Sequence, residues 1–244
     1  MPRLLRFAAS AALLVSVATL LSRLVGFLRW IVFSPTVGAG AVGTAYQSAN
    51  QVPNILFEVV AGGALAGAVV PLLAGPLARA DTRTASRIAS ALLTWSVAVT
   101  LPLAILVAVF SRPIAHALLG DPAQAEYASG FLLVFAPQLV LYGIGGVLTG
   151  VLQAHRKFLW PAFMPLLSSL LVIAVYVGYA RLRGPEVAPD DPAALALLGW
   201  GTTAGVAALA LPLAPPHGAD RPAPAADPPL PGGGRAPGRP PGRR

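Results

Sequence analysis

The first long apolar stretch of this chain contains Ser22-Arg23-Leu24-Val25-Gly26-Phe27-Leu28-Arg29, in which two arginines interrupt the apolar residues. At about 100° per residue, Arg23, Gly26 and Arg29 fall within roughly 120° of one helix face. A charge at the centre of a membrane costs about 2.5–3.5 kcal/mol on insertion scales, so it persists only where it faces a polar interior. The stretch therefore predicts a membrane helix that lines a cavity for an anion, which favours a transporter.

The composition of the chain is typical of a membrane protein. Hydrophobic residues make up 56% of the 244 residues and charged residues only 11%, whereas soluble domains contain about 25% charged residues. The net charge of +8 does not indicate nucleic-acid binding, because most Lys and Arg residues lie between the apolar stretches or in the C-terminal tail. The chain contains no cysteine, which excludes disulfides and thiolate metal sites.

Six apolar stretches are each long enough to cross about 30 Å of hydrocarbon. The second is longer than one span and contains Pro53, which predicts a kinked or broken helix. Strand-like alternation is absent, so we expect residues 1–213 to form an all-α polytopic membrane bundle of about six helices. Residues 214–244 are rich in Pro, Gly and Arg and are expected to be disordered. The six stretches are residues 8–33, 41–77, 88–110, 125–153, 158–180 and 193–213.

The distribution of Lys and Arg between these stretches predicts the orientation in the membrane. Twelve of them lie in the N-terminal segment, in the gaps after the second and fourth stretches, and in the tail, against three in the other gaps. Because positively charged loops stay on the cytoplasmic side, both termini are expected in the cytoplasm. The predicted location is a multi-pass position in the cytoplasmic membrane.

Patterns that could indicate cofactor or metal chemistry have simpler interpretations. Residues 38–43 satisfy the dinucleotide-binding pattern G-x-G-x-x-G, but they follow a membrane span, and position 63, where an acid is required, is glycine. A glycine-rich turn is the better interpretation. The three histidines are far apart in sequence and have no neighbouring cluster of acids, so no metal site is predicted. Nothing resembles a nucleophile with its base, so neither enzymatic activity nor a cofactor is expected.

Two small-residue patterns predict close helix packing. They are Gly63-x-x-x-Gly67 and Gly146-x-x-x-Gly150, and small residues let membrane helices approach closely. In a chain with 25 glycines such matches arise easily, so packing within the chain is favoured over dimerisation.

Glu58 lies within the second apolar stretch, in Pro53-Asn54-Ile55-Leu56-Phe57-Glu58. An acid inside a membrane span usually faces the bundle interior and pairs with another group. Two interpretations stay open. Glu58 forms a salt bridge to Arg23 or Arg29 that locks two helices, or it acts beside the arginines as a charge relay or cargo gate.

An ordered set of short motifs runs through the apolar stretches. The motifs are Ser22-Arg23-x-x-Gly26-Phe27-x-Arg29, Gly38-Ala39-Gly40, Pro53-Asn54, Ala61-Gly62-Gly63-Ala64, Val69-Val70-Pro71, Gln153-Ala154-His155-Arg156-Lys157-Phe158, Pro161-Ala162 and Gly199-Trp200-Gly201. As a set, they resemble the N-terminal part of the MurJ/MviN lipid II flippases of bacterial cell-wall synthesis. These belong to a larger superfamily of multidrug (MATE) and oligosaccharide-lipid exporters, and the resemblance covers about residues 8–213.

The resemblance implies the first lobe of a flippase that moves a polyprenyl-diphosphate-linked sugar across the membrane by alternating access. It implies that two arginines of the first helix bind the diphosphate. This fits the planar guanidinium group of Arg, which binds phosphate well. Expected partners are this lipid II-like cargo, membrane lipids, and a second lobe or cell-wall synthesis proteins. The residues expected to contact the cargo are Arg23, Arg29, Asn54 and Glu58, and the expected hinge or helix-break positions are Gly26 and Pro53.

The chain also departs from the family pattern. Many members have Asp at Thr44, a basic pair at Phe57 and Glu58, and Glu at Gly62, so the charge chemistry of the second stretch differs here. The family has about fourteen helices, whereas this chain supplies one lobe before its Pro/Gly/Arg-rich end, which looks like a frameshift or a misplaced gene end. The chain alone is therefore expected not to transport. Alternatives are an exporter of another amphiphile, or a non-transporting membrane lobe.

Overall fold

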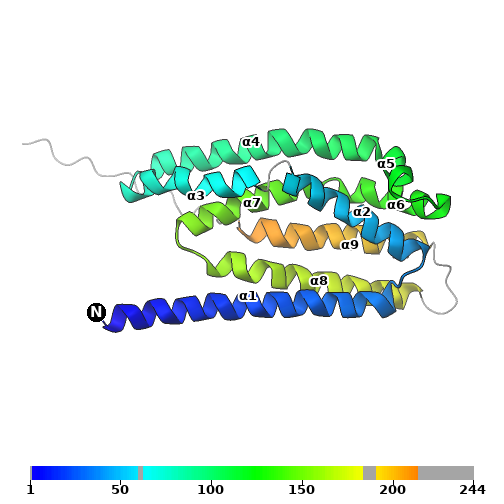
Figure 1. Ribbon diagram of the computed structural model, residues 1–244, viewed down its shortest axis with the longest axis horizontal. Coiled ribbons are helices and arrows are strands. Elements are labelled where there is room, and N and C mark those ends of the chain that lie inside the picture. Colours follow the sequence, from blue (N-terminus) through cyan, green and yellow to red (C-terminus); the bar gives the residue numbers. More distant parts are fainter. Residues whose placement is uncertain (1, 60–62, 184–190, 214–244) are drawn as a thin grey trace, which may run out of the picture. The chain divides into compact units, whose positions relative to one another are not determined.

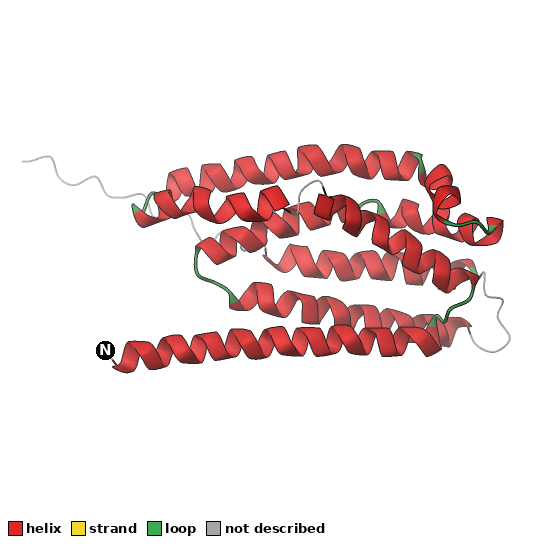
Figure 2. Cartoon of the chain, in the orientation of Figure 1, coloured by secondary structure: helices red, strands yellow, loops and turns green. Residues whose placement is uncertain are grey.

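The computed structural model describes residues 2–59, 63–183 and 191–213 of the chain, and every regular element in these ranges is a helix (Figure 2). This confirms the predicted all-α membrane bundle. The predicted disordered tail lies outside the described residues. The helices are α1 (Pro2–Thr36), α2 (Ala41–Phe57), α3 (Gly63–Ala78), α4 (Thr82–Val109), α5 (Ser111–Leu118), α6 (Pro122–Phe135), α7 (Gln138–Ala154), α8 (Leu159–Arg183) and α9 (Pro192–Ala210), followed by a short 3₁₀ helix, η2 (Leu211–Leu213).

The second and fourth of the six predicted stretches each form two helices, the other four form one each, and α5 lies in a gap between stretches. Within the described ranges, the helices long and apolar enough to cross a membrane are in α1, α4, α8 and α9, and the bent pair α6 and α7 makes a fifth candidate span. The second stretch is divided between α2, with 17 residues, and α3, with 16. Helix α2 continues through Pro53 and ends at Phe57, so the division lies beyond the proline that was expected to cause it.

The bend of 42° between α6 and α7 lies at Pro137. Proline has no N–H and cannot continue the helical hydrogen bonds, so carbonyl groups at the bend need other donors. The hydroxyl of Thr203 on α9 donates to the backbone carbonyl of Val134 at 2.9 Å. The side-chain amide of Gln138 donates to the hydroxyl oxygen of Thr203 at 2.9 Å. Helix α9 thus supplies the polar groups that the bend requires.

The helices pack in a defined set of pairs (Figure 1). Helix α1 lies along α8, and α8 lies along α9. Helix α2 packs against α6, α4 packs against α7, and α3 contacts both α4 and α7. The largest buried cluster is built around aromatic side chains of α1, α2, α6 and α8, namely Phe33, Tyr46, Phe131, Phe135 and Tyr176.

The connections lie at two ends of the bundle. The α3–α4 and α7–α8 connections are at the same end as the N-terminus of α1, on the left in Figure 1, and contain Arg79, Arg156 and Lys157. The α1–α2 and α5–α6 connections are at the opposite end. This matches the predicted alternation of basic and less basic gaps, and the side of the membrane that each end faces stays a prediction.

Local sequence signals place several helix starts. The carboxylates of Asp81, Asp121 and Asp191 accept hydrogen bonds of 2.9–3.0 Å from backbone N–H groups in the first turns of α4, α6 and α9, as helix N-caps do. Residues 37–40 connect α1 to α2, and Gly38 has φ +80°, a conformation that favours glycine. The predicted glycine-rich turn is therefore present.

Candidate functional site

Arg29 lies on the face of α1 that packs against α8. Ala18, Ser22 and Phe33 are buried on this face, and Arg29 is half-buried between Ser22 and Phe33. The hydroxyl of Ser22 donates to the carbonyl of Ala162 on α8 at 2.7 Å, which ties the two helices together. Because residues four apart share a helix face, Arg29 points to the same side as Phe33.

Three tyrosines from three other helices are within electrostatic range of Arg29. Its positive charge interacts electrostatically with the phenol groups of Tyr46 on α2, Tyr142 on α7 and Tyr176 on α8. Tyr46 is 1% exposed and Tyr176 4% exposed, so these hydroxyl groups are inside the bundle. Arg29 therefore faces a polar interior, as the cost of placing a charge in hydrocarbon requires.

The tyrosine hydroxyls form an ordered hydrogen-bond chain. Thr202 on α9 donates its hydroxyl proton to the carbonyl of Leu198 at 2.7 Å. The Thr202 hydroxyl also lies 2.8 Å from the hydroxyl of Tyr46, which lies 3.1 Å from that of Tyr176. Each hydroxyl can both donate one proton and accept. The chain links α2, α8 and α9 and satisfies hydroxyls that would otherwise be buried without partners.

Asn54 and Arg29 both interact with Tyr142. The Asn54 side chain approaches the Tyr142 hydroxyl and donates to the carbonyl of Asn50 at 3.1 Å. The ring of Tyr142 lies 5.9 Å from that of Phe57, between ring centres. Two of the predicted cargo-contacting residues, Arg29 and Asn54, thus both act on Tyr142, although they are 25 positions apart in the sequence.

Arg23 and Glu58 have different surroundings. Both side chains are exposed, and in the part of the chain that the structure describes Glu58 makes no ion pair with Arg23 or Arg29. The salt bridge considered for Glu58 is therefore not formed. Arg23 shares the wide arc of Arg29, but it lies at the edge away from the face that packs on α8, so the structure does not bring the two arginines to the same neighbours.

The predicted hinge positions lie inside continuous helices. Helix α1 runs unbroken through Gly26, and a Cβ at that position would meet no atom within 4 Å. Pro53 is buried within α2. Neither position interrupts its helix, and a hinge role for either stays a prediction.

Among the described residues, no group of three His, Cys, Asp or Glu side chains is placed to hold a metal ion. The residues that sequence reasoning missed are Tyr46, Tyr142, Tyr176 and Thr202. A signal was available, because a buried tyrosine hydroxyl requires a partner. The sequence does not show which tyrosines are buried or which helices bring them together.

Comparisons with known proteins agree with one another. Residues 33–218 match the profile of the family described as "Lipid II flippase MurJ". The chain is 31% identical over 207 residues to a probable lipid II flippase MurJ from Synechocystis, covering 82% of this chain and 38% of that protein. It is 31% identical to the lipid II flippase MurJ of Burkholderia cenocepacia, covering 73% of this chain and 36% of that protein. A probable lipid II flippase MurJ from Vibrio cholerae is 30% identical, with 72% and 36% covered.

The chain spans little more than a third of the length of these relatives. The profile match begins at residue 33, just after Arg29, so it carries no information about the two arginines. Their importance rests on their placement in the structure.

Proposed function

We propose, since this chain belongs to the MurJ lipid II flippase family, that it forms a lobe of a transporter that moves a polyprenyl-diphosphate-linked sugar across the cytoplasmic membrane for cell-wall synthesis. The relatives it matches carry the names of lipid II flippases. The orientation, with both termini in the cytoplasm, and the pairing with a second lobe are part of this proposal.

The observation that carries the proposal is the position of Arg29. Its half-buried side chain lies in an apolar helix, and its charge acts on three tyrosine phenol groups from α2, α7 and α8. A guanidinium presents five donors in a planar fork that matches phosphate oxygens, and its charge is retained at every physiological pH. In a medium of low dielectric constant this attraction for a diphosphate is stronger than in water.

The other predicted residues take supporting roles. Arg23, exposed at the edge of the same arc of α1, would meet the headgroup before it reaches Arg29. Asn54 would supply an amide donor beside Tyr142, and Glu58, exposed and without an ion pair to either arginine, would adjust the local charge as the cargo moves. Gly26 and Pro53 would allow α1 and α2 to bend when the lobe rocks against its partner.

Binding of polyprenyl diphosphate to the purified chain in nanodiscs tests the proposal. The Arg29→Ala variant should weaken binding at least tenfold, because a hydrogen bond to a charged group contributes about 1.5–3 kcal/mol. Arg29→Lys should lose less, since it keeps the charge without the fork. Arg87→Ala, which removes an exposed arginine of α4, is the matched control.

Thermal unfolding of the same samples separates binding from folding. The proposal expects Arg29→Ala to unfold near the temperature of the unaltered chain while its binding falls. If Arg29→Ala bound polyprenyl diphosphate as tightly as Arg87→Ala, the assignment of Arg29 to the cargo would be wrong.

A further inference from the structure

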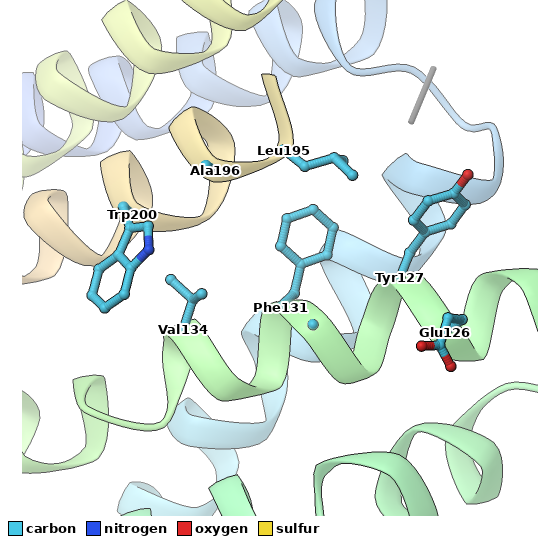
Figure 3. A pocket seen from close by; sticks show the side chains of 8 residues that line it. Glu126, Tyr127, Phe131, Val134, Leu195, Ala196 and Trp200 are labelled. Atoms are coloured by element: carbon cyan, nitrogen blue, oxygen red, sulfur yellow. The ribbon is translucent and has the colours of Figure 1, made fainter. Parts of the chain in front are cut away.

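A pocket of about 270 Å³ lies between α6 and α9, apart from the Arg29 site (Figure 3). Its inner part is lined by Phe131 and Val134 of α6 and by Trp200 of α9, and its outer end by Tyr127 and Glu126. The indole of Trp200 is 57% exposed, so the pocket is open to the surroundings of the bundle. We call it the α6–α9 groove.

The groove begins near the ends of its helices and runs inward. Glu126 is in the second turn of α6, which starts at Pro122, and Leu195 is in the first turn of α9, which starts at Pro192. From Glu126 to Val134 the helix rises by about 12 Å. The groove is therefore polar at one end of the bundle and apolar toward the middle of the membrane, which is the polarity of a phospholipid.

A pair of opposite charges marks the polar end. The guanidinium of Arg112 on α5 lies 3.3 Å from the carboxylate of Glu126, and the two side chains are 74% and 64% exposed. An ion pair this exposed contributes little to the free energy of folding. Each of its two groups can therefore leave the other and bind a different partner at a small cost in free energy. Together they present a cation and an anion to the headgroup region.

We propose that the α6–α9 groove binds one phosphatidylethanolamine molecule. Its phosphate contacts Arg112, its ammonium group contacts Glu126, and an acyl chain lies along Phe131, Val134 and Trp200. A carboxylate beside the groove repels a purely anionic headgroup, and the trimethylammonium of phosphatidylcholine has no N–H to donate to Glu126. This inference is independent of the cargo site at Arg29.

Gly130 gives a direct test of the location. It lines the groove on α6, and a Cβ at this position would meet no atom within 4 Å. In Gly130→Leu the Cβ therefore meets no protein atom, and the larger side chain is attached at a position that lines the groove. Gly67→Leu is the matched control, because Gly67 is an exposed glycine of α3 whose added Cβ also meets nothing within 4 Å.

The measurement is native mass spectrometry of the chain released from nanodiscs of phosphatidylethanolamine, phosphatidylcholine or phosphatidylglycerol. We expect one retained phosphatidylethanolamine per chain, at least tenfold less retention by Gly130→Leu, and unchanged retention by Gly67→Leu. Unchanged retention by Gly130→Leu, as would follow if another protein segment covered the groove, overturns the location.

Glu126→Gln tests the headgroup without altering a buried residue, and so remains informative if Gly130→Leu does not fold. It should abolish the preference for phosphatidylethanolamine over phosphatidylcholine. Equal retention of the two lipids by the unaltered chain, or a preference for phosphatidylglycerol, overturns the assignment of the headgroup.

Discussion

The contact between α3 and α7 is close enough that one added methyl group should be felt. A Cβ at Gly150 would lie 2.7 Å from both Cβ and Cγ1 of Val69, whereas carbon atoms in ordinary contact are about 3.5–4.0 Å apart. Rotation of the Val69 side chain would move its methyl groups but not its Cβ. In Gly150→Ala the two helices must therefore separate by about 1 Å, and overpacking of this kind costs about 1–3 kcal/mol.

Gly67→Ala is the control that isolates this cost. Alanine has a higher helix propensity than glycine by about 1 kcal/mol, and both variants gain it, but a Cβ at Gly67 meets nothing within 4 Å. Gly150→Ala should thus be less stable than Gly67→Ala by the full 1–3 kcal/mol.

Denaturant unfolding of the two purified variants in the same detergent measures the difference. Equal stability of Gly150→Ala and Gly67→Ala would refute the close approach of α3 and α7. It would also remove the reason given for the second glycine of the Gly146-x-x-x-Gly150 pattern.

Three further outcomes are expected. Tyr46→Phe removes hydrogen bonds to Tyr176 and Thr202 and should lower the unfolding free energy by about 1–2 kcal/mol; no loss in denaturant unfolding would contradict the hydroxyl chain. Hydrogen bonds from Thr84 lower the pKa of the Asp81 carboxyl, so its stabilising effect is present at neutral pH and is lost as the pH falls through that lowered pKa. Asp81→Ala should therefore reduce the melting temperature at pH 7 but not in strong acid, and an equal reduction at both would show that the charge is not involved. Because the chain has no cysteine, single introduced cysteines can map the topology. Labelling from outside the cell should succeed at Gly40, Asp121 and Asp191. It should fail at Arg83, His155 and Asp220, and the reverse pattern would invert the predicted orientation.

Much of the fold was predictable because hydrophobic length is a local property. Each apolar stretch became a helix or a pair of helices, and the glycine-rich turn marked a real interruption. The bend at Pro137 was not predicted. Helix α5 was missed, because residues 111–118 lie in a short gap with mixed composition. The division of the second stretch was expected, yet Pro53 remained inside α2, since a helix tolerates proline where neighbouring helices hold it.

The candidate site was only partly predictable. Arg29 stood out because a charge in an apolar helix is costly wherever the fold places it. Helical periodicity also put Arg23 on the same arc, but it could not show that α8 covers only one edge of that arc. A salt bridge was one of two interpretations of Glu58, and among the described residues Glu58 pairs with neither arginine. Spacing along a chain does not determine which side chains of different helices meet.

The sequence by itself determined that this protein lies in a membrane, that it is helical and that a cation lies within an apolar helix. These properties depend on the free energy of transferring single residues or short stretches from water into lipid. Only the tertiary structure decided that Tyr46, Tyr142 and Tyr176 come within electrostatic range of Arg29 and that α6 and α9 leave a groove between them. Those features depend on which helices pack together, and in lipid the packing follows from close fit and hydrogen bonds between distant residues, which no local pattern records.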